Sequence, residues 1–94
     1  MKDPKFKIIA YHKADIVSEF TVETDGLSYL VIYGQHINGG FCAIPNHGIA
    51  CEMSVPEDTY YNYEALKRSG ISTNDARSIA SAILEASNRK KDRS

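Results

Sequence analysis

Apolar and polar residues alternate along the first half of the chain in a pattern that predicts five short β-strands. Apolar residues at every second position are typical of a strand with one buried face, and glycine, proline or asparagine marks the turns between strands. The strands are expected at residues 5–12, 16–24, 27–33 and 41–44, and from residue 49 to about residue 53. Short turns between them favour an antiparallel meander.

Two of these strands carry predictions about their faces. In the first strand, alternation places Ile8 and Ala10 on one face, and Ile9 and Tyr11 on the other. The third strand, 27–33, is apolar almost without a break. Such a run predicts a central strand that is covered on both sides or nearly so.

The fourth strand is expected to belong to two hairpins. If Asn38-Gly39 forms the first turn, His36 lies opposite Phe41. If the second turn, 45–48, is centred on its two middle residues, Cys42 lies opposite Cys51. The two thiols are then cross-strand neighbours on one face, about 5 Å apart at Cβ, and His36 points to the other face.

The second half of the chain predicts two helices. The first is expected from Pro56 to about Arg68, with Gly70 as its stop signal. The second begins at Ser72, which forms a capping box with Asp75, and runs to about residue 89. Its buried stripe is expected to consist of Ala76, Ile79, Ala80, Ile83, Leu84 and Ser87.

These elements define the predicted fold class, α+β: an antiparallel meander of about five strands followed by two helices, with the last helix packed on the sheet. The length of 94 residues predicts one domain, 1–94, in which residues 90–94 form a frayed basic tail. Apolar residues make up 43% of the chain and charged residues 24%, and both values are typical of globular proteins. With no signal-like or membrane-length apolar stretch, we expect a cytoplasmic protein with reduced thiols.

Charge is distributed unevenly along the chain. Both ends are rich in lysine or arginine, whereas the body between them is acidic. An acidic body disfavours a broad nucleic-acid footprint, because phosphate binding needs cations gathered on one surface. A nucleic-acid binder that uses the basic termini remains one alternative.

Histidines and cysteines cluster in the hairpin region. His36, Cys42, His47 and Cys51 are residue types that bind zinc, but their spacing matches no standard zinc motif. The expected hairpins also place the histidines away from the thiols, so we expect no metal and no cofactor. A small thiol- or metal-dependent enzyme or sensor using Cys42, Cys51 and His47, or a reversible disulfide, remains an alternative to a purely structural role.

A tyrosine-rich acidic segment is the main surface candidate. Tyr60, Tyr61 and Tyr63 cannot all face one core, because successive helical residues point about 100° apart. Tyrosine is enriched at protein interfaces, and neighbouring acids suit a basic partner. The alternative is that Tyr60 and Tyr63 cover the edge of the core and Tyr61 is incidentally exposed.

One resemblance adds to these predictions. The second half of the chain resembles small uncharacterised proteins of bacterial mobile elements and phages. The matching residues are Phe41, Cys42, Ile44, Pro45, Asn46, Gly48, Ile49, Cys51, Glu52, Tyr61, Asn62, Leu66, Asp75 and Ala76, whereas His47 stands where an aromatic residue would fit better. The resemblance implies a protein that binds and blocks a host protein, as anti-CRISPR proteins do.

We therefore expect a non-enzymatic interaction protein that inhibits a host protein, in its specific form a CRISPR or other defence nuclease with a basic surface. A homodimer through an exposed strand edge also stays open. The expected partner-binding residues are Glu57, Asp58, Tyr60, Tyr61, Tyr63, Glu64, His36, Asn38 and His47.

Overall fold

The five strands follow one another across a single antiparallel sheet in chain order, and two helices come after them. The computed structural model describes residues 5–13, 17–36 and 39–92. The elements are β1 (Lys7–Lys13), β2 (Val17–Thr24), β3 (Leu27–His36), β4 (Gly39–Ile44), the 3-10 helix η1 (Pro45–His47), β5 (Ile49–Met53), α1 (Thr59–Arg68) and α2 (Thr73–Asp92). The predicted α+β meander with two following helices is confirmed.

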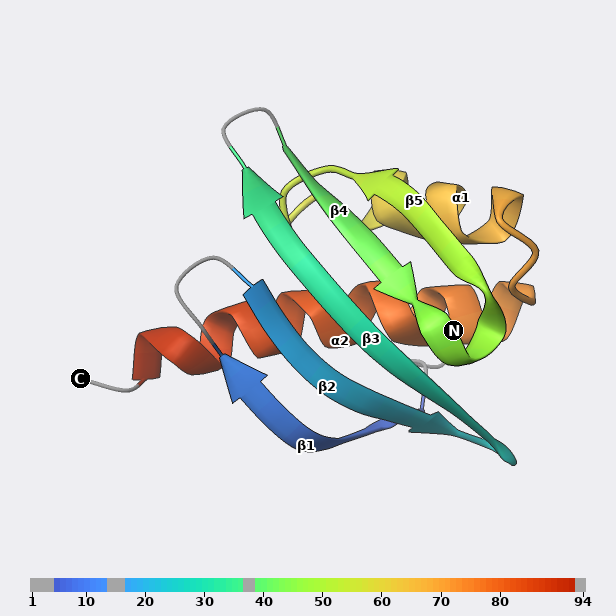
Figure 1. The fold of residues 1–94 in the computed structure, drawn as a ribbon, viewed down its shortest axis with the longest axis horizontal. Helices are drawn as coiled ribbons and strands as arrows, with labels where there is room; N and C mark the ends of the chain where they lie inside the picture. The colour runs from blue at the N-terminus through green and yellow to red at the C-terminus, as the bar shows by residue number, and fades with distance from the viewer. Residues whose placement is uncertain (1–4, 14–16, 37–38, 93–94) are drawn as a thin grey trace.

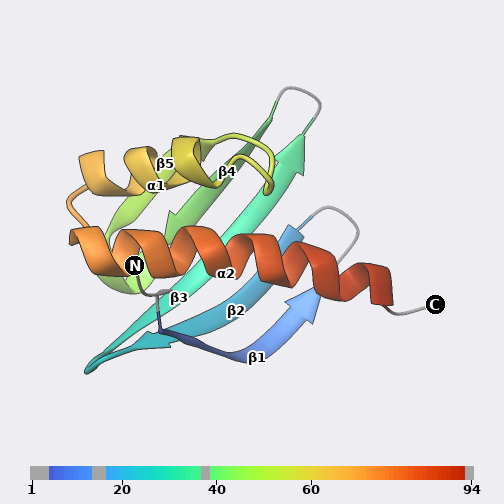
Figure 2. The same cartoon turned by 180° about the vertical axis from the view of Figure 1, so that it is seen from behind.

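Both helices lie on the same face of the sheet. Figure 1 views the sheet with the helices behind it, and Figure 2, from the opposite side, shows α1 and α2 in front. The long α2 crosses the strands, whereas α1 lies toward β4 and β5. We call the face that carries the helices the inner face and the opposite one the outer face.

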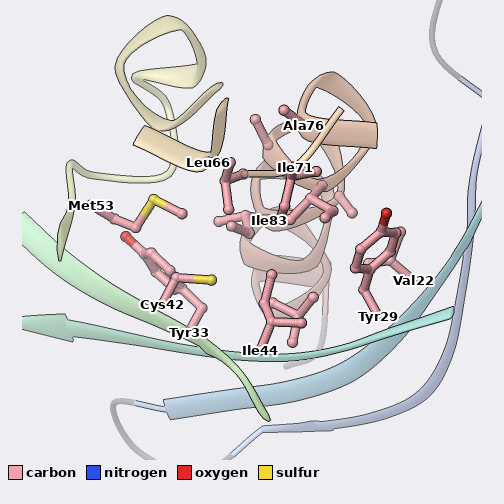
Figure 3. Packing of buried hydrophobic residues seen from close by; sticks show 14 of the residues in the cluster. Val22, Tyr29, Tyr33, Cys42, Ile44, Met53, Leu66, Ile71, Ala76 and Ile83 are labelled. Carbon is pink, nitrogen blue, oxygen red and sulfur yellow. The ribbon is translucent and has the colours of Figure 1, made fainter. Parts of the chain in front are cut away.

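The core fills the space between the inner face and the helices. Figure 3 shows side chains from the strands, such as Tyr33 and Ile44, pointing toward Leu66 of α1 and Ile83 of α2. Several alanines lie on the buried face of α2. Because their side chains are small, the helix can pack close to the sheet. Its fully buried positions are Ala76, Ser78, Ile79, Ala80, Ala82, Ile83 and Ala86. The buried surface is thus wider than the predicted stripe, and Leu84 and Ser87 are only partly buried.

The second hairpin has the predicted register. Cys42 pairs with Cys51, and Ile44 pairs with Ile49. The turn between them is η1, closed by Gly48 in the left-handed conformation at φ 68°. Proline at the start and glycine at the end of this turn favour this register, which continues to the pair of Gly40 with Met53.

The first hairpin departs from its prediction. Gly39 belongs to β4 and pairs with His36, so Phe41 lies opposite Gly34 instead of His36. The physical reason is a close backbone approach: a Cβ added to Gly39 would lie 2.8 Å from the carbonyl oxygen of Met53. Glycine is needed there both for this close approach and for its positive φ of 144°. Asn38 lies outside the described residues.

A β-bulge overturns the predicted faces of β1. The register shifts by one residue between Ile9 and His12, and Ala10 has a positive φ of 55°. One extra residue reverses the alternation after it. Tyr11 therefore packs against the core, where its hydroxyl donates to the carbonyl of Ala86 at 3.1 Å, instead of sharing a face with Ile9.

Two further predictions need correction. β3 is the central strand, but its outer face is not covered by any described element: Leu30 is 39% exposed. The apolar run is explained by one buried face and one exposed apolar face. α1 begins at Thr59 instead of Pro56, because Asp58 is its N-cap. Within the described chain, neither helix is long and apolar enough to cross a membrane.

Candidate interaction surface

The start of α1 is held in place by a buried asparagine. The side chain of Asn62 is 0% exposed; its Oδ1 accepts from the backbone N–H of Ser54 at 2.8 Å, and its Nδ2 donates to the carbonyl of Val55 at 3.1 Å. Asp58 caps the helix, since its Oδ1 accepts from the backbone N–H of Tyr61 at 3.3 Å. These bonds fix how α1 is rotated relative to the sheet.

This rotation decides which tyrosines face outward. With Asn62 pointing inward, Tyr60 is 71% exposed and Tyr61 is 44% exposed, whereas Tyr63 is partly buried against the core. The prediction that at least one of the three is exposed is confirmed. The alternative in which Tyr60 covers the core edge is wrong, because the rotation turns it toward solvent.

Polar contacts already organise part of this surface. A hydrogen bond to Glu64 is the main reason that the pKa of the Tyr60 hydroxyl is raised. The ring of Tyr60 lies 6.2 Å from that of Tyr63, and the Lys67 Nζ lies 5.4 Å from the Tyr63 ring centre. Glu57 and Asp58 are exposed at the same end of α1. The surface thus combines two exposed rings with carboxylates, and we call Glu57, Asp58, Tyr60 and Tyr61 the α1 surface.

Side chains of η1, which forms the second turn, are bonded to β3. β4 pairs with β3 only from Ile32 to His36, so the first half of β3 lacks a strand neighbour on that side. There the Asn46 side chain takes the place of a strand: it accepts from the Leu30 N–H at 2.9 Å and donates to the Ser28 carbonyl at 3.1 Å. A structural role therefore explains why asparagine occupies this turn.

His47 makes a second link to the same strand. Its Nε2 lies 2.8 Å from the Ser28 carbonyl oxygen, a contact that requires the proton on Nε2, and its ring stacks on Tyr29 at 4.3 Å. The Tyr29 hydroxyl in turn donates to Asp75 at 2.5 Å.

The structure does not bring all the predicted contact residues together. His36 is exposed at the end of β3 that leads into β4, whereas His47 lies in the turn that follows β4. The two histidines are thus at opposite ends of β4. Among the predicted contact residues that the structure describes, those of α1 and just before it lie together, and the two histidines lie apart from each other.

The two cysteines are free thiols on the inner face. Cys42 is 1% exposed and Cys51 is half-buried. Burial is the main cause that raises the pKa of both thiols, although Ser69 and Arg68 oppose it at Cys51. Among residues 5–13, 17–36 and 39–92, no three histidine, cysteine, aspartate or glutamate side chains form a group that could hold a metal ion.

Several buried groups should make the protein sensitive to alkali. Burial raises the pKa of Tyr33 to about 12, and it raises the pKa values of Tyr29 and Cys42 as well. A group with a raised folded pKa stabilises the fold fully below its unfolded pKa, and this contribution is lost as pH rises toward the folded pKa. Unfolded cysteine and tyrosine titrate near about 8.5 and 10.

We therefore expect the free energy of unfolding to fall progressively above about pH 9. Urea denaturation followed by circular dichroism at pH 7, 9, 10 and 11 measures this. In Cys42→Ala, the part of the decline below about pH 10 should be smaller, and Cys51, whose pKa is also raised, should account for what remains of it. Equal stability of the wild-type protein at pH 7 and pH 11 would contradict the expectation.

Sequence reasoning missed two parts of the site. Asn62 is part of the sequence resemblance, but a polar residue type gives no indication that its side chain is buried. Leu30 belongs to the strand predicted to be covered, and no sequence feature indicated that Phe41, which is 42% exposed, lies on the same open face. The predicted register placed Phe41 opposite His36, so its pairing with Gly34, which lets the ring lie on the sheet surface, could not be read from the sequence.

Comparison with known proteins identifies a family but no activity. A family model described as a family of unknown function, DUF6618, matches residues 3–91, which is nearly the whole chain. No curated protein and no solved structure matches the chain.

Proposed function

We propose that this chain, which belongs to the family of unknown function DUF6618, is a non-enzymatic interaction protein. It binds a basic surface of a partner protein through the α1 surface. The observation that carries the proposal is the outward orientation of Tyr60 and Tyr61, 71% and 44% exposed, next to Glu57 and Asp58.

The chemistry of these side chains supports such contacts. A tyrosine ring offers a large rigid area at a small cost in side-chain entropy, and its hydroxyl can still form a hydrogen bond. Neighbouring carboxylates attract lysine and arginine, which mainly raises the association rate and the specificity. The surface is also held rigidly, because Asn62 and Asp58 fix the helix start.

The specific form of the proposal follows the sequence resemblance. The partner is a host protein that the chain inhibits, and a CRISPR or other defence nuclease is a fitting target. Nucleases carry basic surfaces that bind phosphates, and the carboxylates of the α1 surface can occupy such a surface.

The thiol-dependent alternative is less favoured. A nucleophilic cysteine needs a lowered pKa and access to substrate. In this fold burial raises the pKa of both thiols, and Cys42 is enclosed in the core. His47, the base that this alternative names, is engaged with Ser28 and Tyr29.

The first test identifies the partner and then measures its affinity. The tagged chain is used to capture proteins from a nuclease-treated lysate of its native host, and the captured protein is purified. Glu57→Gln/Tyr60→Ala/Tyr61→Ala should weaken its binding about 10- to 100-fold, because exposed aromatic anchors carry much of the energy of an interface. Asp58 is kept because its replacement would also remove the helix cap.

A matched variant separates ring contact from hydroxyl chemistry. Tyr60→Phe/Tyr61→Phe keeps both rings and should retain most of the affinity. Circular dichroism checks that each variant is folded. Undiminished binding by the alanine variant would place the interface elsewhere and refute the proposed role of α1.

A further inference from the structure

The outer face of the sheet carries a continuous apolar area that no described element covers. Ile9 is 38% exposed, Leu30 39% and Phe41 42%, and Figure 1 shows this face free of both helices. Cross-strand pairing makes these residues neighbours. Ile9 and Leu30 both pair with Thr21. Ile32, two residues after Leu30, pairs with Ala43, which is two residues after Phe41 on the same face of β4. Contiguous exposed apolar area of this kind marks interaction sites more often than isolated residues do.

The aromatic residue in this area is held in a defined position. Phe41 pairs with Gly34, and a Cβ on Gly34 would overlap the Phe41 ring. The ring therefore lies across the glycine on the sheet surface. An anchor held this way loses little freedom on binding, which favours affinity.

Carboxylates surround the apolar centre. The strand register places Glu19 beside Ile32 and Glu52 beside Phe41. Glu23 lies at the end of β2 that leads into the β2–β3 turn. Lys7, paired with Glu23, is the one lysine among the outward positions with described side chains. Among the described side chains of this face, carboxylates therefore outnumber cations, in contrast to the basic ends of the chain.

This charge pattern selects one kind of occupant. A second copy would place carboxylates against carboxylates around the same apolar centre, and an anionic membrane or a nucleic acid would be repelled. A protein segment that has apolar side chains flanked by lysine or arginine complements both features.

We infer that the outer face is a docking surface for a basic amphipathic segment of a partner protein, separate from the α1 surface. The apolar side chains of that segment cover Leu30, Ile32 and Phe41. Its cations pair with Glu19, Glu23 and Glu52.

Site-directed photocrosslinking in the full chain tests this inference. Benzoylphenylalanine is incorporated in place of Leu30, and separately in place of Tyr61, and each protein is irradiated in a native-host lysate. We expect the Leu30 probe to capture a protein peptide that combines apolar residues with lysine or arginine. The triple variant Glu19→Gln/Glu23→Gln/Glu52→Gln, which keeps side-chain size, should reduce the yield at least fivefold. A probe at Asn88, exposed on α2, serves as the background control.

Each other outcome overturns the inference. These outcomes are an adduct with a second copy, with lipid or with nucleic acid, a yield unchanged by the triple variant, and a yield no higher than that of the Asn88 probe. If only the Tyr61 probe captures a partner, the outer-face inference fails while the proposed role of α1 stands. If only the Leu30 probe captures a partner, the proposed role of α1 fails while the outer-face inference stands. Circular dichroism of each probe-bearing protein confirms that it is folded.

Discussion

Replacing Asn62 with alanine is expected to lower the free energy of unfolding by about 2–4 kcal/mol. The substitution leaves the Ser54 N–H without its partner and removes one of the two donors to the Val55 carbonyl, which keeps its bond from the Asp58 N–H. A backbone group left without a partner costs its full desolvation, whereas a formed hydrogen bond contributes only modestly. The cavity left by the side chain, which is 0% exposed, adds to the loss.

Chemical denaturation followed by circular dichroism measures this effect. Asn88→Ala is the matched control, because Asn88 is exposed on α2 and alanine favours a helix. The control should keep or slightly raise stability. A loss below about 1 kcal/mol for Asn62→Ala would mean that water replaces the amide without difficulty. The asparagine would then position α1 without stabilising the fold.

Gly40→Ala is expected to cost about 2–3 kcal/mol, a typical value for overpacking in a rigid environment. An added Cβ would lie 2.7 Å from the Gly34 carbonyl oxygen and 2.8 Å from the Tyr33 hydroxyl oxygen. The backbone oxygen cannot move without disturbing the pairing of β3 with β4. The Tyr33 hydroxyl is itself fixed by its hydrogen bond to the Ser54 carbonyl at 2.8 Å.

Replacing a second glycine, Gly48, separates the steric contribution to the loss of stability from the contribution of backbone conformation. Gly48 has a positive φ of 68°, but nothing lies within 4 Å of an added Cβ. Gly48→Ala should therefore cost only about 1 kcal/mol, from the left-handed backbone alone. Urea denaturation of both variants gives the comparison. Equal losses would show that the contacts around Gly40 relax freely.

Local chemistry explains which parts of the fold were predictable. The register of Cys42 with Cys51 follows from a turn whose proline fixes φ and whose glycine permits the left-handed conformation, so it could be predicted from the sequence. The capping box was equally readable, and the Ser72 hydroxyl does accept from the Asp75 N–H at 3.3 Å. The exposure of at least one tyrosine follows from helix geometry.

Other features depend on contacts between distant segments. The glycine of Asn38-Gly39 reads as a turn residue, but it lies in β4, where the approach of β5 and a positive φ of 144° both require it. The bulge at Ala10 has no glycine to announce it, so the inward position of Tyr11 could not be read from alternation. The outer face escaped prediction because an apolar run gives the same pattern for a covered strand and for one with an apolar exposed face. Which tyrosine is exposed depends on the buried Asn62.

The bonds from Asn46 to β3 also bear on how the chain avoids aggregation. The first half of β3 is apolar, carries no charge from Leu27 to Ile32 and lacks a strand neighbour on one side. An unpaired strand edge of this composition is a template for cross-β association between chains. By occupying the Leu30 N–H and the Ser28 carbonyl, the Asn46 amide keeps these groups from a strand of another molecule. The turn that sets the cysteine register thereby also protects the sheet from growing into a fibril.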